Sequence, residues 1–473
     1  MAIEAVQMTV ADRNRQAAGT LVEQVMEFVR QQIASRQTPA GARLPSIRGL
    51  AETMQVSKST VVEAYDRLAA EGVILSRPGS GFYVAGHLPP FSLSATGPEL
   101  DREVDPVWMT RQSLNAETGL LKPGCGWLPA SWMPEADIRR GLRLLARRGD
   151  AGLTDYSTPH GLPALRQLLA RRLGDRGIEA SPHQIMLTES GTQAIDLLCR
   201  FLVEPGDAVL VDDPCYFNFH AMLRAHRVRV VSVPYRAAGP DLEQFEQVLR
   251  EHAPRLYMTN SALHNPTGAT LSPVVAHRVL KLAEAHDLLI IEDDIFADFE
   301  HQPAPRLAAF DGLDRVIHIG SFSKTLSAAI RCGYIAARTD WIEQLVDLKL
   351  ATSFGGGCFA ADLVLTLLKD GSYRKHVSGL RQRLADAMGK VGSKLKAGGL
   401  TPVIEPEAGM FLWCRLPNGL DAAAVARKAL ANNVVLAPGN AFSLAQSSSG
   451  FLRFNVAQSL DPKIFTVLEQ AME

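Results

Sequence analysis

Residues 321–334 read Ser-Phe-Ser-Lys-Thr-Leu-Ser-Ala-Ala-Ile-Arg-Cys-Gly-Tyr, which places one lysine, Lys324, directly after Ser321 and Ser323. Arg331 follows seven residues after the lysine. A lysine that forms a Schiff base with pyridoxal phosphate (PLP) needs hydroxyl groups and a cation nearby, because these groups hold the cofactor's phosphate. The stretch therefore indicates a cofactor-binding domain of the kind found in enzymes.

The composition of the chain is that of an ordinary globular protein. Its 473 residues are 47% hydrophobic and 21% charged, a length that predicts two or three domains. The net charge of −1 provides no overall basic field for nucleic acid, and no apolar run is long enough to cross a membrane. Six cysteines lie scattered without a C-x-x-C pair. We therefore expect a cytoplasmic protein with reduced thiols, no metal site and no membrane partner.

The first part of the chain predicts three helices followed by a hairpin. Apolar residues recur every four positions over residues 20–35 and predict one buried stripe: Leu21, Val25, Val29 and Ile33. Further helices are expected over Ser46–Met54 and from Ser57 up to Gly72. Two short strands follow, at 73–76 and 82–84. This order is that of a winged helix-turn-helix, a mainly α domain.

The third of these helices carries a polar first turn that suits a recognition helix. It begins Ser57-Lys58-Ser59-Thr60, which supplies donors for base edges and phosphates. Arg48 on the preceding helix, with Arg77 and Ser80 in the hairpin, is expected to contact the DNA backbone. The same residues could be solvated helix starts and a surface hairpin. Charge does not decide between these interpretations, since residues 1–88 hold nine Lys/Arg and eight Asp/Glu.

Beyond residue 105, short apolar strands alternate with helical patterns. This alternation predicts an α/β sheet covered by helices on both faces, in which ligands bind beyond the carboxyl ends of the strands. The expected strands are Ile185–Thr188, Ala208–Val211, Arg229–Val233, Leu256–Thr259, Leu288–Ile291 and Val316–Ile319.

Polar motifs follow these strands and together meet the requirements of PLP. Each motif alone could be an ordinary turn or helix cap. A cradle of hydroxyl, backbone N–H and guanidinium groups suits the phosphate, an aromatic ring stacks on the pyridine, an amide donates to O3′, a carboxylate pairs with the ring nitrogen, and a lysine binds the aldehyde. In that order the residues are Ser190, Gly191, Thr192, Ser321, Ser323 and Arg331, then Tyr216, Asn265, Asp293 and Lys324.

Two known families share these motifs. Leu44–Ala51, Val56–Leu68 and Glu71–Val84 closely resemble the GntR-type winged-helix domain, while residues from about 105 to 473 resemble the fold-type I (class I) aminotransferases. Together they resemble the layout of the MocR subfamily of bacterial regulators. The resemblance implies a multidomain chain, with a PLP-dependent transferase fold of type I and a smaller C-terminal α+β subdomain. The expected boundaries are 14–87 for the winged helix, 88–105 for a linker and 106–473 for the PLP-binding domain.

The aminotransferase resemblance adds three further residues. It implies that Tyr156 reaches the phosphate of the other subunit's cofactor in a homodimer, and that Arg453 grips the α-carboxylate of a bound amino compound. The family pattern places a tyrosine shortly after the pyridine-binding aspartate, but this chain has Phe296 there. We therefore expect the hydrogen bond from that tyrosine to O3′ to be missing.

Two functions remain open from the sequence. The first is a PLP-dependent transcriptional regulator that binds a double-stranded DNA operator and senses an amino compound, or PLP itself. The second is an active aminotransferase that uses an amino acid and a 2-oxo acid acceptor. Lys324, Asp293, Asn265 and Arg453 do not exclude turnover, whereas Phe296 weighs against it.

Overall fold

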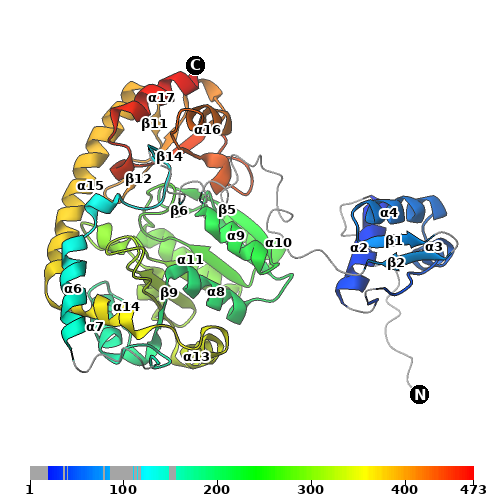
Figure 1. The fold of residues 1–473 in the computed structure, drawn as a ribbon, viewed down its shortest axis with the longest axis horizontal. Coiled ribbons are helices and arrows are strands. Elements are labelled where there is room, and N and C mark those ends of the chain that lie inside the picture. The colour runs from blue at the N-terminus through cyan, green and yellow to red at the C-terminus, as the bar shows by residue number, and fades with distance from the viewer. Residues whose placement is uncertain are drawn as a thin grey trace. The chain divides into compact units, whose positions relative to one another are not determined.

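The chain folds into two compact units, which we call the head (residues 1–95) and the body (residues 96–473) (Figure 1). A computed structural model describes residues 20–35, 38–39, 41–77, 80–85, 110, 114, 119–148 and 156–473. The expected linker, residues 88–105, lies outside the described residues. Within the described ranges, no helix is long and apolar enough to cross a membrane.

The head contains the three helices and the hairpin that the sequence predicts. Its elements are α2 (Leu21–Ala34), α3 (Ile47–Met54), α4 (Lys58–Ala70), β1 (Ile74–Arg77) and β2 (Gly81–Val84), the two strands being antiparallel. Thr20, Ser46 and Ser57 cap the helices, since each side chain accepts a hydrogen bond from a backbone N–H of the first turn. Gly72 follows α4 with a φ of +72°, a conformation that favours glycine at a helix end.

One expectation for the core of the head is wrong. Val25, Val29 and Ile33 are buried as predicted, but Leu21 is 52% exposed because it is the first residue of α2 and the stripe reaches the core one turn later. Tyr65 closes the core from α4. Its hydroxyl donates to the carbonyl oxygen of Pro45 at 2.9 Å, which ties α4 to the start of α3.

The body is built on an eight-stranded sheet with the order β3-β10-β9-β8-β7-β4-β5-β6. Strands β4, β5, β7, β8 and β9 pair in parallel, whereas β10 runs antiparallel to both of its neighbours and β6 antiparallel to β5. The six predicted strands are all present. Three of them, β4, β5 and β9, are longer than predicted by two or three residues, and β8 begins one residue later and ends two residues later than predicted. Their bounds are β3 (Ile185–Thr188), β4 (Ala208–Asp213), β5 (Arg229–Arg236), β6 (Gly239–Pro240), β7 (Leu256–Thr259), β8 (Leu289–Asp293), β9 (Val316–Ser321) and β10 (Gly333–Ala336).

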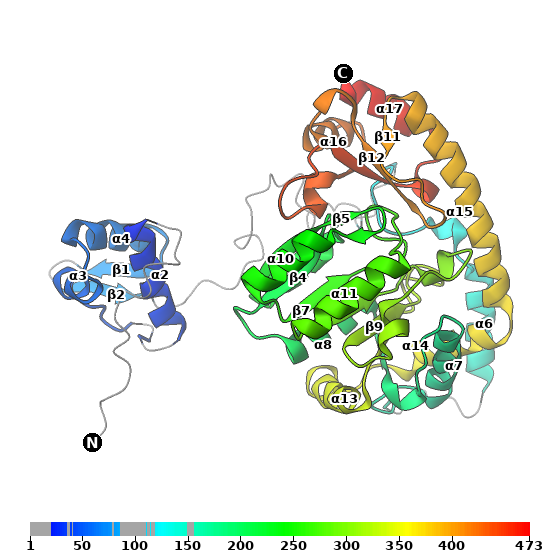
Figure 2. The same cartoon turned by 180° about the vertical axis from the view of Figure 1, so that it is seen from behind.

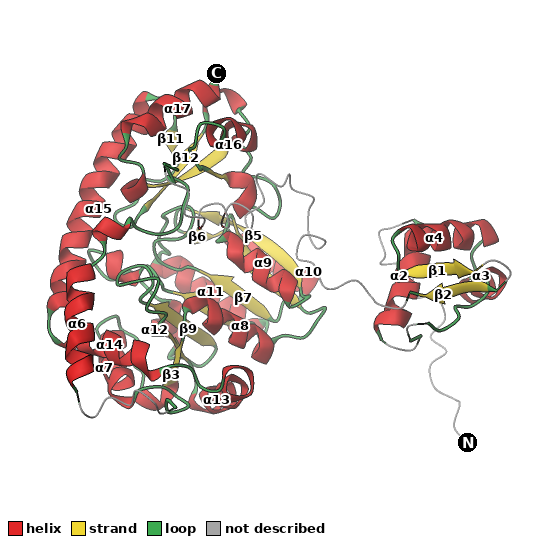
Figure 3. Cartoon of the chain, viewed as in Figure 1, coloured by secondary structure: helices red, strands yellow, loops and turns green. Residues whose placement is uncertain are grey.

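Helices cover both faces of this sheet (Figure 3). One core layer joins the sheet to α7, α10, α11, α12 and α14, and the other joins it to α8, α9 and α13. Neighbouring residues of a strand enter opposite layers, as Tyr257 and Met258 of β7 do. The helices are α6 (Glu135–Arg147), α7 (Pro163–Gly174), α8 (Gly191–Leu202), α9 (Phe217–Ala225), α10 (Leu242–His252), α11 (Pro273–Ala285), α12 (Leu307–Asp311), α13 (Thr339–Ser353) and α14 (Cys358–Lys369).

A smaller α+β subdomain completes the body, as expected. The 26-residue helix α15 (Ser372–Ala397) runs along the outer edge of the body and leads into this subdomain (Figures 1 and 2). Its antiparallel sheet has the order β11-β12-β14-β13 and packs against α15, α16 and α17. The bounds are β11 (Thr401–Pro402), β12 (Phe411–Arg415), α16 (Ala422–Leu430), β13 (Ala437–Pro438), β14 (Phe451–Asn455) and α17 (Pro462–Met472). Short 3-10 turns are η3 (Ala130–Trp132), η4 (Pro182–Gln184), η5 (Ala297–Phe299), η6 (Pro417–Gly419), η7 (Gly439–Phe442) and η8 (Val456–Gln458).

A buried ionic network fixes the carboxyl end of β8. The guanidinium of Arg306 is fully buried and contacts Asp294 at 3.1 Å and Glu300 at 2.6 Å, and Nε2 of His318 lies 3.1 Å from Asp294 Oδ2. Burial alone would raise the pKa of Asp294, but Arg306 and His318 outweigh it and hold that pKa well below its usual range. The network therefore anchors the strand end on which Asp293 also lies.

Removing the central cation should destabilise the body strongly. We expect Arg306→Met to lower the free energy of unfolding by about 3–5 kcal/mol, because Asp294 and Glu300 then remain buried without a counter-ion. Urea denaturation of the full chain measures this loss through tryptophan fluorescence, since all five tryptophans lie in the body.

Arg250→Met is the matched control. Arg250 pairs with Glu246 on the exposed face of α10, so its loss should change the free energy of unfolding by less than about 1 kcal/mol. Equal urea midpoints for the two variants would contradict a role of Arg306 in stability.

Candidate functional site

A cavity of about 420 Å³ lies in the body, at the carboxyl ends of the parallel strands. Its walls come from the loops that follow β3, β4, β7, β8 and β9, together with β14 of the small subdomain. The structure brings together twelve of the predicted site residues, which all line this cavity: Ser190, Gly191, Thr192, Tyr216, Asn265, Asp293, Phe296, Ser321, Ser323, Lys324, Arg331 and Arg453.

One end of the cavity is suited to an anion. Ser190 caps α8, and the backbone N–H groups that follow it at the helix N-terminus have no acceptor within the helix. Ser321 Oγ and Ser323 Oγ lie 3.0 Å apart. Among the described residues, the Arg331 guanidinium makes one hydrogen bond, a long one of 3.5 Å to the Ala328 carbonyl. These donors and this cation fit a phosphate group.

Gly333 of β10 allows this end of the cavity to form. A Cβ at residue 333 would lie 2.8 Å from the carbonyl carbon of Ser190 and 3.0 Å from the nitrogen of Gly191. Only a glycine therefore lets β10 lie directly against the turn that begins α8. The sequence analysis noted neither β10 nor this contact.

Asp293 is a buried carboxylate without a cationic partner. It ends β8, is 5% exposed, and accepts one hydrogen bond, from the Ile295 N–H at 3.2 Å. Among the described residues, no Lys, Arg or His nitrogen lies within 4 Å of its carboxylate. Burial raises the pKa of Asp293 to about 6. A protonated ring nitrogen is the kind of partner that this carboxylate lacks.

Lys324 lies in the same cavity, and its pKa is lowered. Its ammonium donates to the carbonyl oxygen of Gly126 at 2.6 Å. Burial, and then the positive charge of Arg453, lower the pKa of Lys324 to about 8. An amine with a lowered pKa is a better nucleophile near neutral pH, which suits condensation with an aldehyde.

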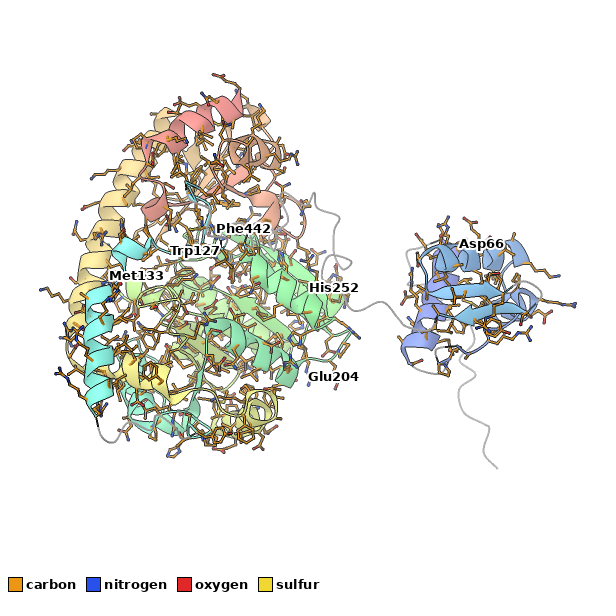
Figure 4. The ribbon with its side chains drawn as sticks, viewed as in Figure 1. Asp66, Trp127, Met133, Glu204, His252 and Phe442 are labelled. Atoms are coloured by element: carbon orange, nitrogen blue, oxygen red, sulfur yellow. The ribbon has the colours of Figure 1, made fainter. Side chains whose placement is uncertain are left out.

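Arg453 joins the small subdomain to the sheet. It is 1% exposed and donates to Asn265 Oδ1 at 2.7 Å and to the Gly124 carbonyl at 2.6 Å. Its guanidinium lies over the rings of Phe411 and Phe442, at the boundary where Figure 4 labels Phe442 and Trp127. Burial lowers the pKa of Arg453 to about 10, so the group stays charged at neutral pH. Since Asn265 accepts from Arg453, its amide NH₂ remains for a ligand.

Phe296 and Tyr156 occupy different surroundings. Phe296 is buried at the wall of the cavity, with its ring centroid 5.6 Å from that of Phe411 in an edge-to-face arrangement, and it has no hydroxyl to donate. Tyr156 is 81% exposed, packs against Phe354 at 5.0 Å, and does not line the cavity of its own chain. A role for Tyr156 in a partner's cavity stays a prediction.

The sequence analysis missed several residues of the cavity wall. Asn260 donates to the backbone oxygen of Asp293 at 2.9 Å, and it directly follows β7. The rule that ligands bind beyond the carboxyl ends of strands could have found it. Asn218 and Phe217 come from α9, where the sequence shows only an ordinary helix.

The DNA-facing residues predicted in the head are all exposed or half-buried. Ser57, Lys58, Ser59 and Thr60 form the first turn of α4. The hydroxyl oxygens of Ser59 and Thr60 each lie 2.7 Å from that of Ser57. Lys58 is exposed and has no ion pair among the described residues. In the other elements, Arg48 pairs with Glu52, Arg77 lies over the Tyr83 ring, and Ser80 bonds to the Tyr83 hydroxyl.

Comparison with known proteins decides the family. Residues 135–469 match the family aminotransferase class I and II, and residues 21–84 match the bacterial regulatory proteins of the gntR family. The HTH-type transcriptional regulator YdcR of Escherichia coli is 30% identical over 446 residues, which cover 92% of this chain and 94% of YdcR. The chain belongs to the MocR subfamily of GntR-type transcriptional regulators. NorG of Staphylococcus aureus, another HTH-type regulator, is 28% identical over 73% of this chain and 79% of its own.

Solved structures agree with this assignment for the body of the regulator. LysN of Thermus thermophilus, an α-aminoadipate aminotransferase complexed with N-(5′-phosphopyridoxyl)-L-leucine, matches with a TM-score of 0.70 and 26% identity, covering 81% of this chain and 97% of LysN. A kynurenine aminotransferase of Pyrococcus horikoshii matches with a TM-score of 0.72 and 24% identity, covering 81% and 96%. The body thus has the fold of the type I PLP-dependent transferases, and the head is a DNA-binding domain of the GntR type.

The lowered pKa of Lys324 predicts how the rate of its reaction with added PLP should depend on pH. Only the neutral amine attacks the aldehyde, so the capture rate should rise with pH and reach half its maximum near pH 8, rather than near the value of about 10.4 for a free lysine. Stopped-flow mixing of cofactor-free protein with PLP across pH 6–11 measures this midpoint.

Two variants of Arg453 serve as the comparison. Arg453→Gln removes a positive charge near Lys324 and should move the midpoint to higher pH, whereas Arg453→Lys keeps the charge and should move it less. A midpoint that is the same in all three proteins would show that Arg453 does not act on Lys324.

Proposed function

We propose that the regulator senses an amino compound through PLP held on Lys324, and that ligand binding in the body changes the affinity of the head for its operator. One observation carries this proposal: a single cavity holds a lysine of lowered pKa, a buried carboxylate without a counter-ion, and a free anion cradle. A volume of about 420 Å³ lies within the usual range for small-molecule sites.

Each polar group of the cavity would hold a different part of the cofactor. Bound PLP supplies an aldehyde that reacts reversibly with amines. The start of α8 and the Ser321–Arg331 loop would bind the phosphate, and Tyr216 would stack on the ring. Asp293 would accept a hydrogen bond from the protonated ring nitrogen and keep it protonated, and Asn265 would donate to O3′. Phe296 contributes apolar contact alone, because it has no hydroxyl.

Arg453 would select ligands that carry a carboxylate. Its planar guanidinium suits a bidentate contact, and its two present partners are neutral oxygens that a carboxylate could replace. Because Arg453 belongs to the small subdomain and Lys324 to the larger part, one ligand would bridge both. A ligand shifts the regulator between two states only as far as its affinities for those states differ.

In the head, the first turn of α4 would read the operator, with Arg48, Arg77 and Ser80 on the backbone of double-stranded DNA. A DNA-bound regulator acts in the cytoplasm of a bacterium.

The exposed ring of Tyr156 supports a homodimer in which this residue completes the phosphate site of the partner subunit. Titration of the PLP-loaded protein with candidate amines would show whether the effector is an amino compound or PLP alone.

An active aminotransferase is the second candidate. The presence of Lys324, Asp293, Asn265 and Arg453 in one cavity favours it, while the missing hydroxyl at Phe296 weighs against rapid turnover. Steady-state assays with a panel of amino acids and 2-oxo acids separate the candidates. Sustained cycling would replace the pure sensor with an enzyme, and ligand binding without cycling would support the sensor.

The role of Lys58 can be measured by salt dependence. Lys58→Ala should weaken binding to a duplex from the regulator's own upstream region and reduce the slope of log K against log salt concentration by about 0.9, the contribution of one phosphate contact. Fluorescence anisotropy at several salt concentrations gives both quantities.

Arg30→Ala is the control in the same unit. Arg30 lies on α2 and pairs with Glu71 at 2.6 Å, so its removal should leave the salt slope unchanged. A slope that is unchanged in Lys58→Ala as well would place Lys58 away from the phosphates.

The role of Arg453 can be tested with matched ligands. Arg453→Gln should weaken binding of an amino acid by about 10- to 100-fold, because it removes a charged hydrogen bond worth about 1.5–3 kcal/mol. The amine that lacks the carboxylate should bind wild type and variant alike. Titration of the visible absorbance of the PLP-loaded protein measures both ligands.

Lys324→Ala should lose the visible absorbance of bound cofactor, while Lys281→Ala on the exposed face of α11 should keep it.

Equal losses of affinity for the amino acid and the amine in Arg453→Gln would mean that Arg453 does not contact the carboxylate.

A further inference from the structure

A second cavity of about 480 Å³ lies between the start of α6 and the first half of α15. Figure 4 labels Met133 where α6 begins beside α15, next to Trp132 in the cavity wall. This cavity shares no lining residue with the first one. None of the roles proposed above uses it.

The walls of the second cavity carry an excess of positive charge. Arg140 is held by Asp137 at 2.7 Å and Asp370 at 2.9 Å. Lys375 and Arg383 of α15 also line the cavity, and neither has an acidic partner within 4 Å among the residues that the structure describes. The guanidinium of Arg383 lies 4.1 Å above the ring of Trp132, which holds it at the cavity wall.

The spacing on α15 leaves room between these two cations. Lys375, Gly379 and Arg383 are four residues apart, so they lie on one face of the helix. A Cβ placed on Gly379 meets no atom within 4 Å. Glycine is disfavoured within helices, and here it keeps an open space between two free cations.

The wall of this cavity also contacts the backbone beside the cofactor lysine. Nε2 of His376 lies 2.8 Å from the carbonyl oxygen of Thr325, the residue after Lys324. The hydroxyl of Tyr373, one turn earlier on α15, lies 2.6 Å from Thr325 Oγ1. A ligand that contacts His376 would therefore change the position of the backbone segment that carries Lys324.

We propose that the α6–α15 cavity is a second ligand site, for a small anion that carries a phosphate group, and that its occupancy is felt at Lys324. Arg383 supplies a planar fork and Lys375 a point charge, the two kinds of cation that bind phosphates. The site is concave and small, which favours a metabolite over the backbone of DNA. Binding here would not require an amino compound in the first cavity.

Calorimetric titration with pyrophosphate at constant ionic strength tests the site. The protein is loaded with PLP, so that the phosphate cradle at Ser190 and Arg331 is filled. We expect one saturable site per chain in the wild type. The double variant Lys375→Ala/Arg383→Ala should bind at least 10-fold more weakly, and Gly379→Leu should abolish binding by filling the open space.

Gly389→Leu is the matched control, because Gly389 lies on the same helix and its Cβ would also meet no atom within 4 Å. It should bind as the wild type does. No saturable heat in the wild type, or the same affinity in Gly379→Leu, would overturn the site. A loss of operator affinity in Lys375→Ala/Arg383→Ala without any pyrophosphate binding would instead assign these cations to DNA.

The proposed coupling to Lys324 has its own readout. Pyrophosphate should shift the pH midpoint of the visible absorbance of bound PLP in the wild type, with the dissociation constant found by calorimetry, but not in Gly379→Leu. Saturable heat with an unmoved spectrum would overturn the coupling. If the chain fails to take up PLP, the first proposal fails, while the comparison of Gly379→Leu with Gly389→Leu still decides the second site.

Discussion

The body depends on two adjacent carboxylates at the carboxyl end of β8, Asp293 as its last residue and Asp294 directly after it, which experience opposite surroundings. Asp294 is paired with Arg306 and His318, which hold its pKa well below the usual range, whereas Asp293 has no cation and burial raises its pKa to about 6. Neighbouring residues of a strand face opposite sides of a sheet, so one carboxylate enters the core and the other the cavity. The ionic network fixes the strand end, and this rigidity holds Asp293, which has no cation within 4 Å among the described residues, in position for a ligand.

Much of this arrangement can be predicted from the sequence because it is local. The positions of six strands, helix caps such as Ser46 and Ser57, and polar residues after strands all depend on short segments, and they agree with the structure, although some strands end later than predicted. The parts that escaped prediction depend on distant partners. In the sequence alone, nothing distinguishes Arg306 from a surface arginine. Its burial depends on Asp294, Glu300 and His318, which surround it only in the folded body. Strand β10 is four buried residues without alternation, and its antiparallel pairing is decided by its neighbours.

One of the polar contacts between the two subdomains of the body lies in the cavity. Arg453 of β14 reaches Asn265 of the larger part and Gly124, while two aromatic rings of the small subdomain cover its guanidinium. A buried cation with neutral partners remains available for an anion. A ligand that replaced the partners of Arg453 would change the contacts between the two subdomains, and not those within one of them. The fold found in transaminases could in this way respond to ligand binding.

Helix α15 links the two cavities and the small subdomain in one continuous element. Its 26 residues span about 39 Å at 1.5 Å per residue, and His376 and Tyr373 hold its first turns against Thr325. A rod of this length acts as a lever: a tilt of about 5° at its base displaces its far end by roughly 3 Å. That displacement is larger than the range of distances over which a hydrogen bond persists. A small change of the contacts at Thr325 would therefore move the whole small subdomain.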